Sequence, residues 1–126
     1  MGTNSYISYY EDGVTTYVYC ASDSYLEWVG YKLLSKYNDI GKIKQLVGMG
    51  SIYHLDDSIE MVDGLSFYNT IDGYSVFFHR DRGDELVIKR GSELKECLMD
   101  YIYIFKEGRW YYNRGKGRFK LLKMIN

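Results

Sequence analysis

The sequence contains no proline, and only two cysteines and two histidines among its 126 residues. This composition excludes a collagen-like repeat, which needs regular glycine and abundant proline. Cys20 and Cys97 lie far apart and in no metal-ligand spacing, so a disulfide scaffold and a structural zinc site are both disfavoured. We expect two reduced, packed thiols in a cytosolic protein that holds no metal and needs no cofactor.

Long apolar runs are also absent, since no stretch approaches the roughly 18 apolar residues that a membrane span needs. The first residues have neither the charged nor the apolar region of a secretion signal. The hydrophobic fraction of 46% and the charged fraction of 26% are those of an ordinary globular protein. We therefore expect one domain spanning residues 1–126, without a membrane partner.

Tyrosine, by contrast, is abundant, with 15 copies that mark two predicted hairpins. Residues 6–11 and 14–20 are rich in aromatic and β-branched residues and flank an Asp-Gly pair, a strong hairpin signal. Residues 101–105 and 109–113 flank a second turn that ends in glycine. Strand alternation places some of these tyrosines in a core and others outward. Outward tyrosines beside the C-terminal basic residues are the expected recognition surface.

Two helices are predicted between the hairpins. Residues 24–38 carry one apolar stripe at helical spacing, and Gly30 inside this run suggests a close approach to the sheet. Residues 40–47 form a second helix, with Asp39 as its cap and Gly48 as its stop.

The remaining segments carry weaker signals. We expect a strand at 74–79, a short helix at 92–99, and either an edge strand or a helical turn at 119–125. Residues 51–72 read as an acidic, partly helical loop with no role beyond solvation. Together these elements predict an α+β fold, in which a mostly antiparallel sheet of two hairpins and a central strand packs on two helices of the N-terminal half.

The net charge of −1 conceals a division along the chain. Residues 106–126 hold seven lysines and arginines against one glutamate, a formal charge of +6, so the rest of the chain carries −7. Such a division of charge indicates either a partner with a strong electrostatic field or ion pairing between the two parts of the chain. Both interpretations stay open at this stage.

The C-terminal basic stretch interleaves cations with aromatic residues, a composition typical of nucleic-acid surfaces and of protein hot spots. A solvated edge hairpin, in which basic side chains discourage edge pairing, is the third interpretation. An exposed aromatic patch on the first helix is a further interface candidate. The candidate partner-binding residues are Arg109, Trp110, Tyr112, Arg114, Lys116, Arg118, Lys120, Trp28 and Tyr31.

Polar chemistry is most concentrated at residues 79–84. Its histidine and arginines could bind phosphate, with a further acid from elsewhere, and the alternative is an Arg–Asp network that pins a turn. The residues of this candidate phosphate or polar site are Asp23, His79, Arg80, Asp81 and Arg82. His54 has no partner that the sequence identifies.

The N-terminal half of the sequence contains a recognisable pattern, formed by Tyr17-Val18-Tyr19, Asp23, Tyr25, Glu27, Val29, Gly30, Leu33-Leu34, Tyr37-Asn38, Lys42, Leu46-Val47 and Gly50. This pattern resembles one in a family of small uncharacterised phage and prophage proteins. The stretch from His79 to Asp84 is similar to a His-Arg-Asp-Arg-Gly-Glu segment of that family, and Tyr101-Ile102-Tyr103 and Trp110 resemble its closing hairpin. The family's His-Trp pair falls on Ala21 and Ser22 here, and its following glycine on Ser24, so no role of that histidine transfers.

The resemblance implies a phage or mobile-element protein that works in the cytoplasm of a bacterial host, and it brings no known reaction. We expect a protein that binds and inhibits a host protein or nucleoprotein, such as a CRISPR–Cas defence complex. Its acidic body could mimic nucleic acid. The alternative is a protein that binds a nucleotide or single-stranded nucleic acid, as a sponge or a phosphate-ligand hydrolase, through His79, Arg80 and Arg82.

Overall fold

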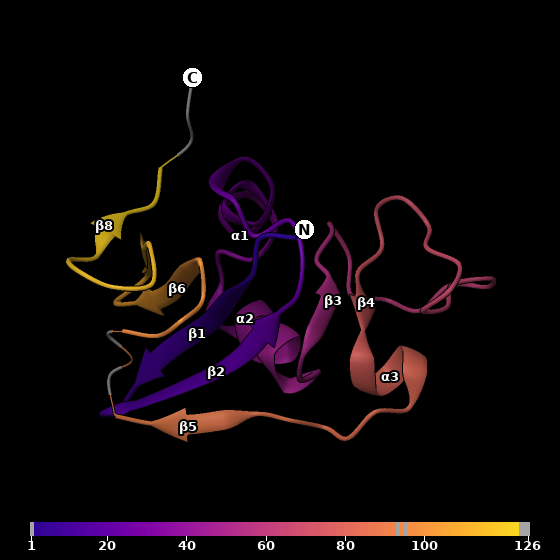
Figure 1. Ribbon diagram of the computed structural model, residues 1–126, viewed down its shortest axis with the longest axis horizontal. Helices are drawn as coiled ribbons and strands as arrows, with labels where there is room; N and C mark the ends of the chain where they lie inside the picture. The colour runs from indigo at the N-terminus through magenta and orange to yellow at the C-terminus, as the bar shows by residue number, and fades with distance from the viewer. Residues whose placement is uncertain (1, 93, 95, 124–126) are drawn as a thin grey trace.

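The computed structural model describes residues 2–92, 94 and 96–123. Its strands form one sheet in the order β4-β3-β2-β1-β6-β7-β8, and β5 pairs with β2 beside this path (Figure 1). The strands are β1 (Ser5–Glu11), β2 (Val14–Cys20), β3 (Ile52–His54), β4 (Val76–Phe77), β5 (Lys89–Gly91), β6 (Tyr101–Lys106), β7 (Arg109–Asn113) and β8 (Lys120–Leu121). The helices are the π-helix η1 (Leu26–Gly30), which continues into α1 (Tyr31–Lys36), then α2 (Ile40–Gly48) and α3 (Phe78–Arg82).

Both predicted hairpins are confirmed, as β1–β2 and β6–β7. Their two-residue turns place Asp12 and Gly13 at φ 53° and 81°, and Glu107 and Gly108 at φ 53° and 79°. Positive φ at both central residues is what a type I′ turn requires, and glycine adopts it without steric cost.

The α+β class is confirmed, but the sheet is mixed rather than uniformly antiparallel. The two hairpins join through a parallel pairing of β1 with β6, in which Ser5 lies opposite Tyr101. A second parallel contact joins β2 to β3 at Cys20 and Ile52. Parallel pairing is possible here because a long connection that includes helices separates each pair of strands.

The predicted central strand at 74–79 is corrected in both length and place. Only Val76–Phe77 forms a strand, β4, and it lies at one end of the sheet. The chain then turns into α3, where a carboxylate oxygen of Asp81 accepts a hydrogen bond of 2.8 Å from the Phe77 amide. His79 and Asp81 therefore lie on a helix, and strand alternation does not govern their directions.

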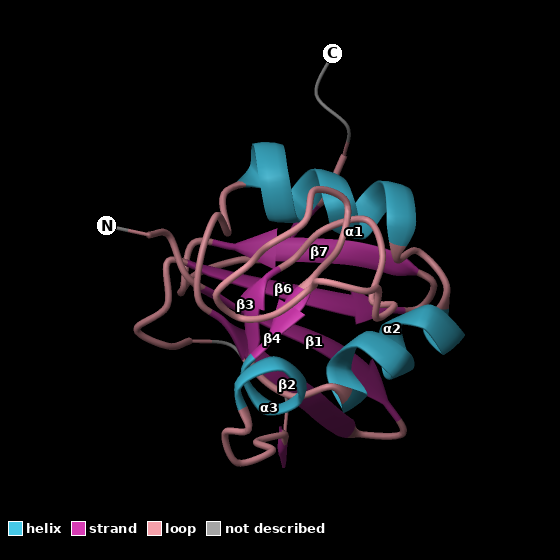
Figure 2. Ribbon diagram, turned by 90° about the vertical axis from the view of Figure 1, so that its right-hand side faces the viewer, coloured by secondary structure: helices cyan, strands magenta, loops and turns pink. Residues whose placement is uncertain are grey.

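The core lies between one face of the sheet and the helices, which pack over it (Figure 2). Gly30 shows why a glycine interrupts the first predicted helix, because an added Cβ would lie 3.4 Å from Leu122 and 3.6 Å from the Tyr103 hydroxyl. The second helix is confirmed, and its Asp39 side chain accepts a hydrogen bond from the Lys42 amide at 3.1 Å. The buried residues of this core cluster are Ile7, Val18, Cys20, Val29, Leu33, Tyr37, Ile43, Leu46, Val47, Ile52, Leu55, Phe77, Tyr101, Tyr103, Phe105, Trp110 and Leu122.

The three segments with weak sequence signals differ in how well the structure agrees with the predictions. Residues 119–125 contribute the short edge strand β8, and positions 124–126 lie outside the described residues. No helix forms at the described positions of 92–99, of which 93 and 95 lie outside them. The segment 51–72 contains β3 and a buried carboxylate, Asp56, so its interpretation as a merely solvated loop is wrong.

Candidate functional site

Two of the proposed partner-binding aromatic residues serve the core instead. Trp110 is only 2% exposed, and its indole N–H donates to the Tyr37 carbonyl at 2.8 Å. Tyr112 is partly buried and packs against the same core. Their alternation with Tyr111 directs both toward the helices, because residues two apart on a strand share a face. Trp110 is therefore not accessible to a partner, whereas part of Tyr112 remains accessible.

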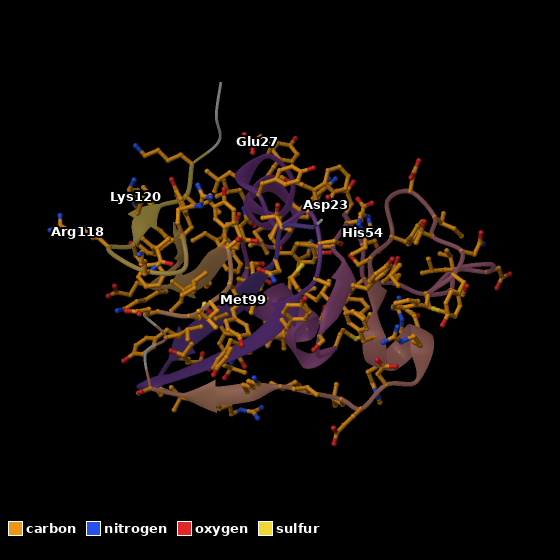
Figure 3. The ribbon with its side chains drawn as sticks, viewed as in Figure 1. Asp23, Glu27, His54, Met99, Arg118 and Lys120 are labelled. Atoms are coloured by element: carbon orange, nitrogen blue, oxygen red, sulfur yellow. The ribbon has the colours of Figure 1, made fainter. Side chains whose placement is uncertain are left out.

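The basic residues of the same stretch do reach solvent. Arg109 begins β7, Lys120 begins β8, and the loop between these strands carries Arg114, Lys116 and Arg118, all exposed. We call these five residues the basic segment. Figure 3 shows Arg118 and Lys120 at the outer edge of the molecule, on the side away from His54.

The basic segment forms no ion pair within the part of the chain that the structure describes. Elsewhere Lys32, Lys44, Arg80 and Arg82 each lie within 4.0 Å of an aspartate or glutamate oxygen. The Arg114 guanidinium lies 4.5 Å from the centre of the Tyr101 ring. Ion pairs among the described residues therefore do not neutralise these five charges.

Trp28 and Tyr31 were proposed as an exposed aromatic patch on the first helix, but only Tyr31 is exposed. Tyr31 is 47% exposed. Trp28 is half-buried, and its indole N–H donates to the Leu55 carbonyl at 2.7 Å. The Lys32 ammonium covers the Trp28 ring at 4.5 Å, which occupies the face that a partner would stack on.

The polar segment at 79–84 forms the turn-pinning network rather than an open phosphate site. Arg80 donates to both carboxylate oxygens of Asp81 and to the carbonyls of Ile59 and Ser75. Arg82 makes two hydrogen bonds to Asp84, at 2.9 and 2.6 Å, and these hold the pKa of that carboxyl below its ordinary value.

The two other members of the proposed phosphate site do not complete it. His79 Nδ1 lies 2.7 Å from the Asp84 carbonyl oxygen. Asp23, which was to supply the further acid, lies instead beside His54, with 4.0 Å between its carboxylate and Nδ1. Arg80 is thus fully engaged within the protein and Asp23 lies elsewhere, so the proposed phosphate site does not converge.

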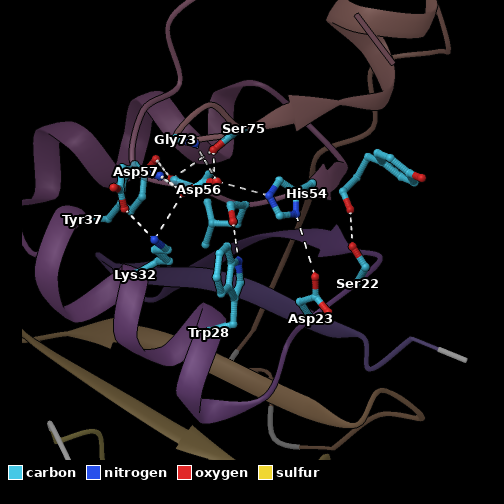
Figure 4. Close-up of polar contacts among 12 residues, drawn as sticks. Ser22, Asp23, Trp28, Lys32, Tyr37, His54, Asp56, Asp57, Gly73 and Ser75 are labelled. Carbon is cyan, nitrogen blue, oxygen red and sulfur yellow. Dashed lines mark hydrogen bonds and ion pairs between the residues drawn. The ribbon is translucent and has the colours of Figure 1, made fainter. Parts of the chain in front are cut away.

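A different polar cluster, which the sequence did not reveal, surrounds His54 (Figure 4). His54 Nε2 lies 3.3 Å from Asp56, while its other ring nitrogen faces Asp23. Lys32 lies 3.2 Å from Asp56 and 2.8 Å from Asp57. We call these five side chains the His54 cluster. The His-x-Asp spacing at the end of a strand was the only sequence signal for it.

Asp56 is the buried centre of this cluster. Burial alone would raise the pKa of its carboxyl, but hydrogen bonds from the amides of Asp57 and Gly73, together with Lys32, lower it below the ordinary value. Its backbone is held as well, because its amide donates to the Ser75 hydroxyl at 2.7 Å and its carbonyl accepts from the Tyr37 hydroxyl at 2.7 Å. The cluster therefore ties α1 to the loop that follows β3.

His54 contacts two carboxylates and one aromatic ring. Its ring nitrogens face Asp56 and Asp23, and its ring lies tilted against that of Trp28. Within the described ranges, no group of three or more histidine, cysteine, aspartate or glutamate side chains could hold a metal ion. What the contacts of the cluster show is the attachment of α1 to the loop after β3. The exposed basic segment is the candidate functional surface.

Comparison with known proteins finds no match to a protein-family model, to a curated protein or to a solved structure. Across residues 2–92, 94 and 96–123, no helix has the length and apolarity that crossing a bilayer would demand.

Proposed function

We propose that this protein acts by binding, and that its basic segment attaches it to a strongly acidic surface of a host component. The observation that carries the proposal is that five exposed cations within twelve residues have no ion pair in the described structure. Inhibition of a bacterial defence complex by a phage-encoded protein is the biological setting that the sequence resemblance favours.

Electrostatics explains how such a segment would work. Like charges held close together repel one another, and an oppositely charged partner relieves that repulsion while it steers the encounter. The segment lies at an edge of the sheet, so a partner can approach it without disturbing the core. Because salt screens exposed charges over about 10 Å at 0.1 M, binding should weaken as salt rises.

The test is retention of bacterial-lysate components on the immobilised protein. We expect the triple variant Arg114→Glu, Arg118→Glu and Lys120→Glu to lose the retained acidic component, and the wild type to lose it at high salt. The matched control reverses three exposed cations outside the segment, Lys36, Lys42 and Arg90, and should retain the component. Equal retention by the two triple variants would overturn the proposal, provided circular dichroism shows both to be folded.

A further inference from the structure

A hollow lies beside the basic segment, on the face of the sheet opposite the core. It has a volume of about 210 Å³ and is lined by Ile104, Lys106, Glu107, Tyr111 and Phe119. Ile104 and Tyr111 are direct partners in the β6–β7 ladder, so their side chains lie on the same face. Tyr111 and Phe119 are each half-buried, which leaves part of each aromatic side chain accessible.

The face that carries this hollow has a consistent chemical character. Alternation from the buried positions of β1, β2, β6 and β7 directs twelve side chains to it, and none of them is acidic. These twelve residues are Tyr6, Ser8, Tyr10, Thr15, Tyr17, Tyr19, Ile102, Ile104, Lys106, Arg109, Tyr111 and Asn113, of which Ser8, Thr15, Ile102, Ile104 and Asn113 are buried and the others partly or fully exposed. Glu107, in the hairpin turn, is the only acid of the hollow's lining.

Cations lie next to the hollow. Arg118 precedes Phe119 in the chain and is exposed. Lys106, which lines the hollow, lies in register with Arg109 at the end of the β6–β7 hairpin, so these two side chains share the face of the hollow. Lys120 pairs with Tyr112 and therefore lies on the other face. A flat ring placed in the hollow would thus have the positive charges of Lys106, Arg109 and Arg118 near it.

From this arrangement we infer that the acidic partner of the basic segment is single-stranded nucleic acid, with one base seated against Tyr111 and Phe119 and the adjoining phosphates on Arg118 and Arg109. This inference rests on the proposed function and names its partner. Aromatic faces stack bases of any sequence, and lysine and arginine neutralise phosphates. A duplex keeps its bases stacked on one another, and an acidic protein has no regular flat ring between its charges, so neither fits the hollow as well.

The test is fluorescence anisotropy with three probes at 50 and 200 mM salt: a labelled twelve-nucleotide oligouridylate, a twelve-base-pair duplex and polyglutamate. We expect the oligouridylate to bind most tightly. Phe119→Ala should weaken its binding about tenfold, because stacking contributes roughly 1–3 kcal/mol for each base. Phe119→Trp, which keeps an aromatic face, should preserve binding. Tyr68→Ala, at a tyrosine that is 84% exposed and outside the hollow, should leave it unchanged.

The outcomes separate this inference from the proposed function. Tighter binding of the duplex or of polyglutamate, or unchanged binding of oligouridylate by a folded Phe119→Ala variant, overturns the nucleic-acid inference. Polyglutamate binding that the triple reversal abolishes, without oligouridylate binding, leaves the proposed function standing and identifies an acidic protein as the partner. If the triple reversal also retains every lysate component, the proposed function itself fails.

Discussion

The ammonium of Lys32 lies 3.2 Å from a carboxylate oxygen of Asp56, and the two side chains are only 13% and 7% exposed. Lys44 and Glu11 form a pair at 2.8 Å, but each of these side chains is 46% exposed. One of these two ion pairs is nearly buried and the other is exposed, and this difference in surroundings determines how much each contributes to stability. Water screens the exposed pair, whereas the buried carboxylate depends on its partners.

We expect Lys32→Met to lower the free energy of unfolding by about 2–3 kcal/mol, because removing one partner leaves a buried carboxylate poorly compensated. Lys44→Met, the matched control, should cost distinctly less, because water screens this exposed pair. Urea denaturation followed by circular dichroism measures both values. Equal costs for the two variants would show that Asp56 does not depend on the lysine.

Stability should also depend on acid pH through Asp56. The pKa of this carboxyl is lower in the folded protein than its ordinary value, so the charged form is favoured by folding. Its contribution is fully present above the unfolded pKa, near 3.9, and is lost as the pH falls from there through the folded pKa. In Asp56→Asn, the free energy of unfolding should be lower at pH 6 and should fall less between pH 5 and pH 3. If the free energy of unfolding of Asp56→Asn falls as steeply between pH 5 and pH 3 as that of the wild type, other carboxyl groups cause the pH dependence.

Two glycines in the loop between β7 and β8 allow a test of how tightly this loop packs against its neighbours. Gly115 and Gly117 have φ of 86° and 87°, so alanine is similarly strained at both. A Cβ at Gly115 would clash with the Met99 carbonyl oxygen, whereas nothing lies within 4 Å of a Cβ at Gly117. We expect Gly117→Ala to cost about 1 kcal/mol and Gly115→Ala distinctly more. Thermal denaturation measures the difference, and equal melting temperatures would mean that residues 97–99 do not pack on the loop as described.

The two thiols should differ in reactivity. Cys20 is fully buried, and burial raises the pKa of its thiol to about 11, while burial also raises that of the partly exposed Cys97. Ellman's reagent should therefore label one thiol in the folded protein, at a rate that increases with pH, and the second only after unfolding. Cys97→Ser should abolish labelling of the folded protein. Rapid labelling in that variant would show that Cys20 is accessible.

Local chemistry is what the sequence predicted well. The turn at Asp12 and Gly13 and the helix capped by Asp39 depend on residues within a few positions of one another, and both formed as expected. The division of charge toward the C-terminus was equally visible without a structure. Signals of this kind survive folding because they act through backbone geometry and formal charge, which do not depend on distant partners.

The tertiary structure decided which side chains meet across the chain. It paired β1 with β6, directed Trp110 into the core, and brought Asp23 beside His54 and Lys32 beside Asp56. Composition alone cannot assign a tryptophan to a core or a surface, because burial depends on which face of the sheet the helices cover. The sequence by itself determined that the C-terminus carries excess positive charge. Only the fold showed that five of those cations stay unpaired among the described residues, since ion pairing requires acids within about 4 Å in space.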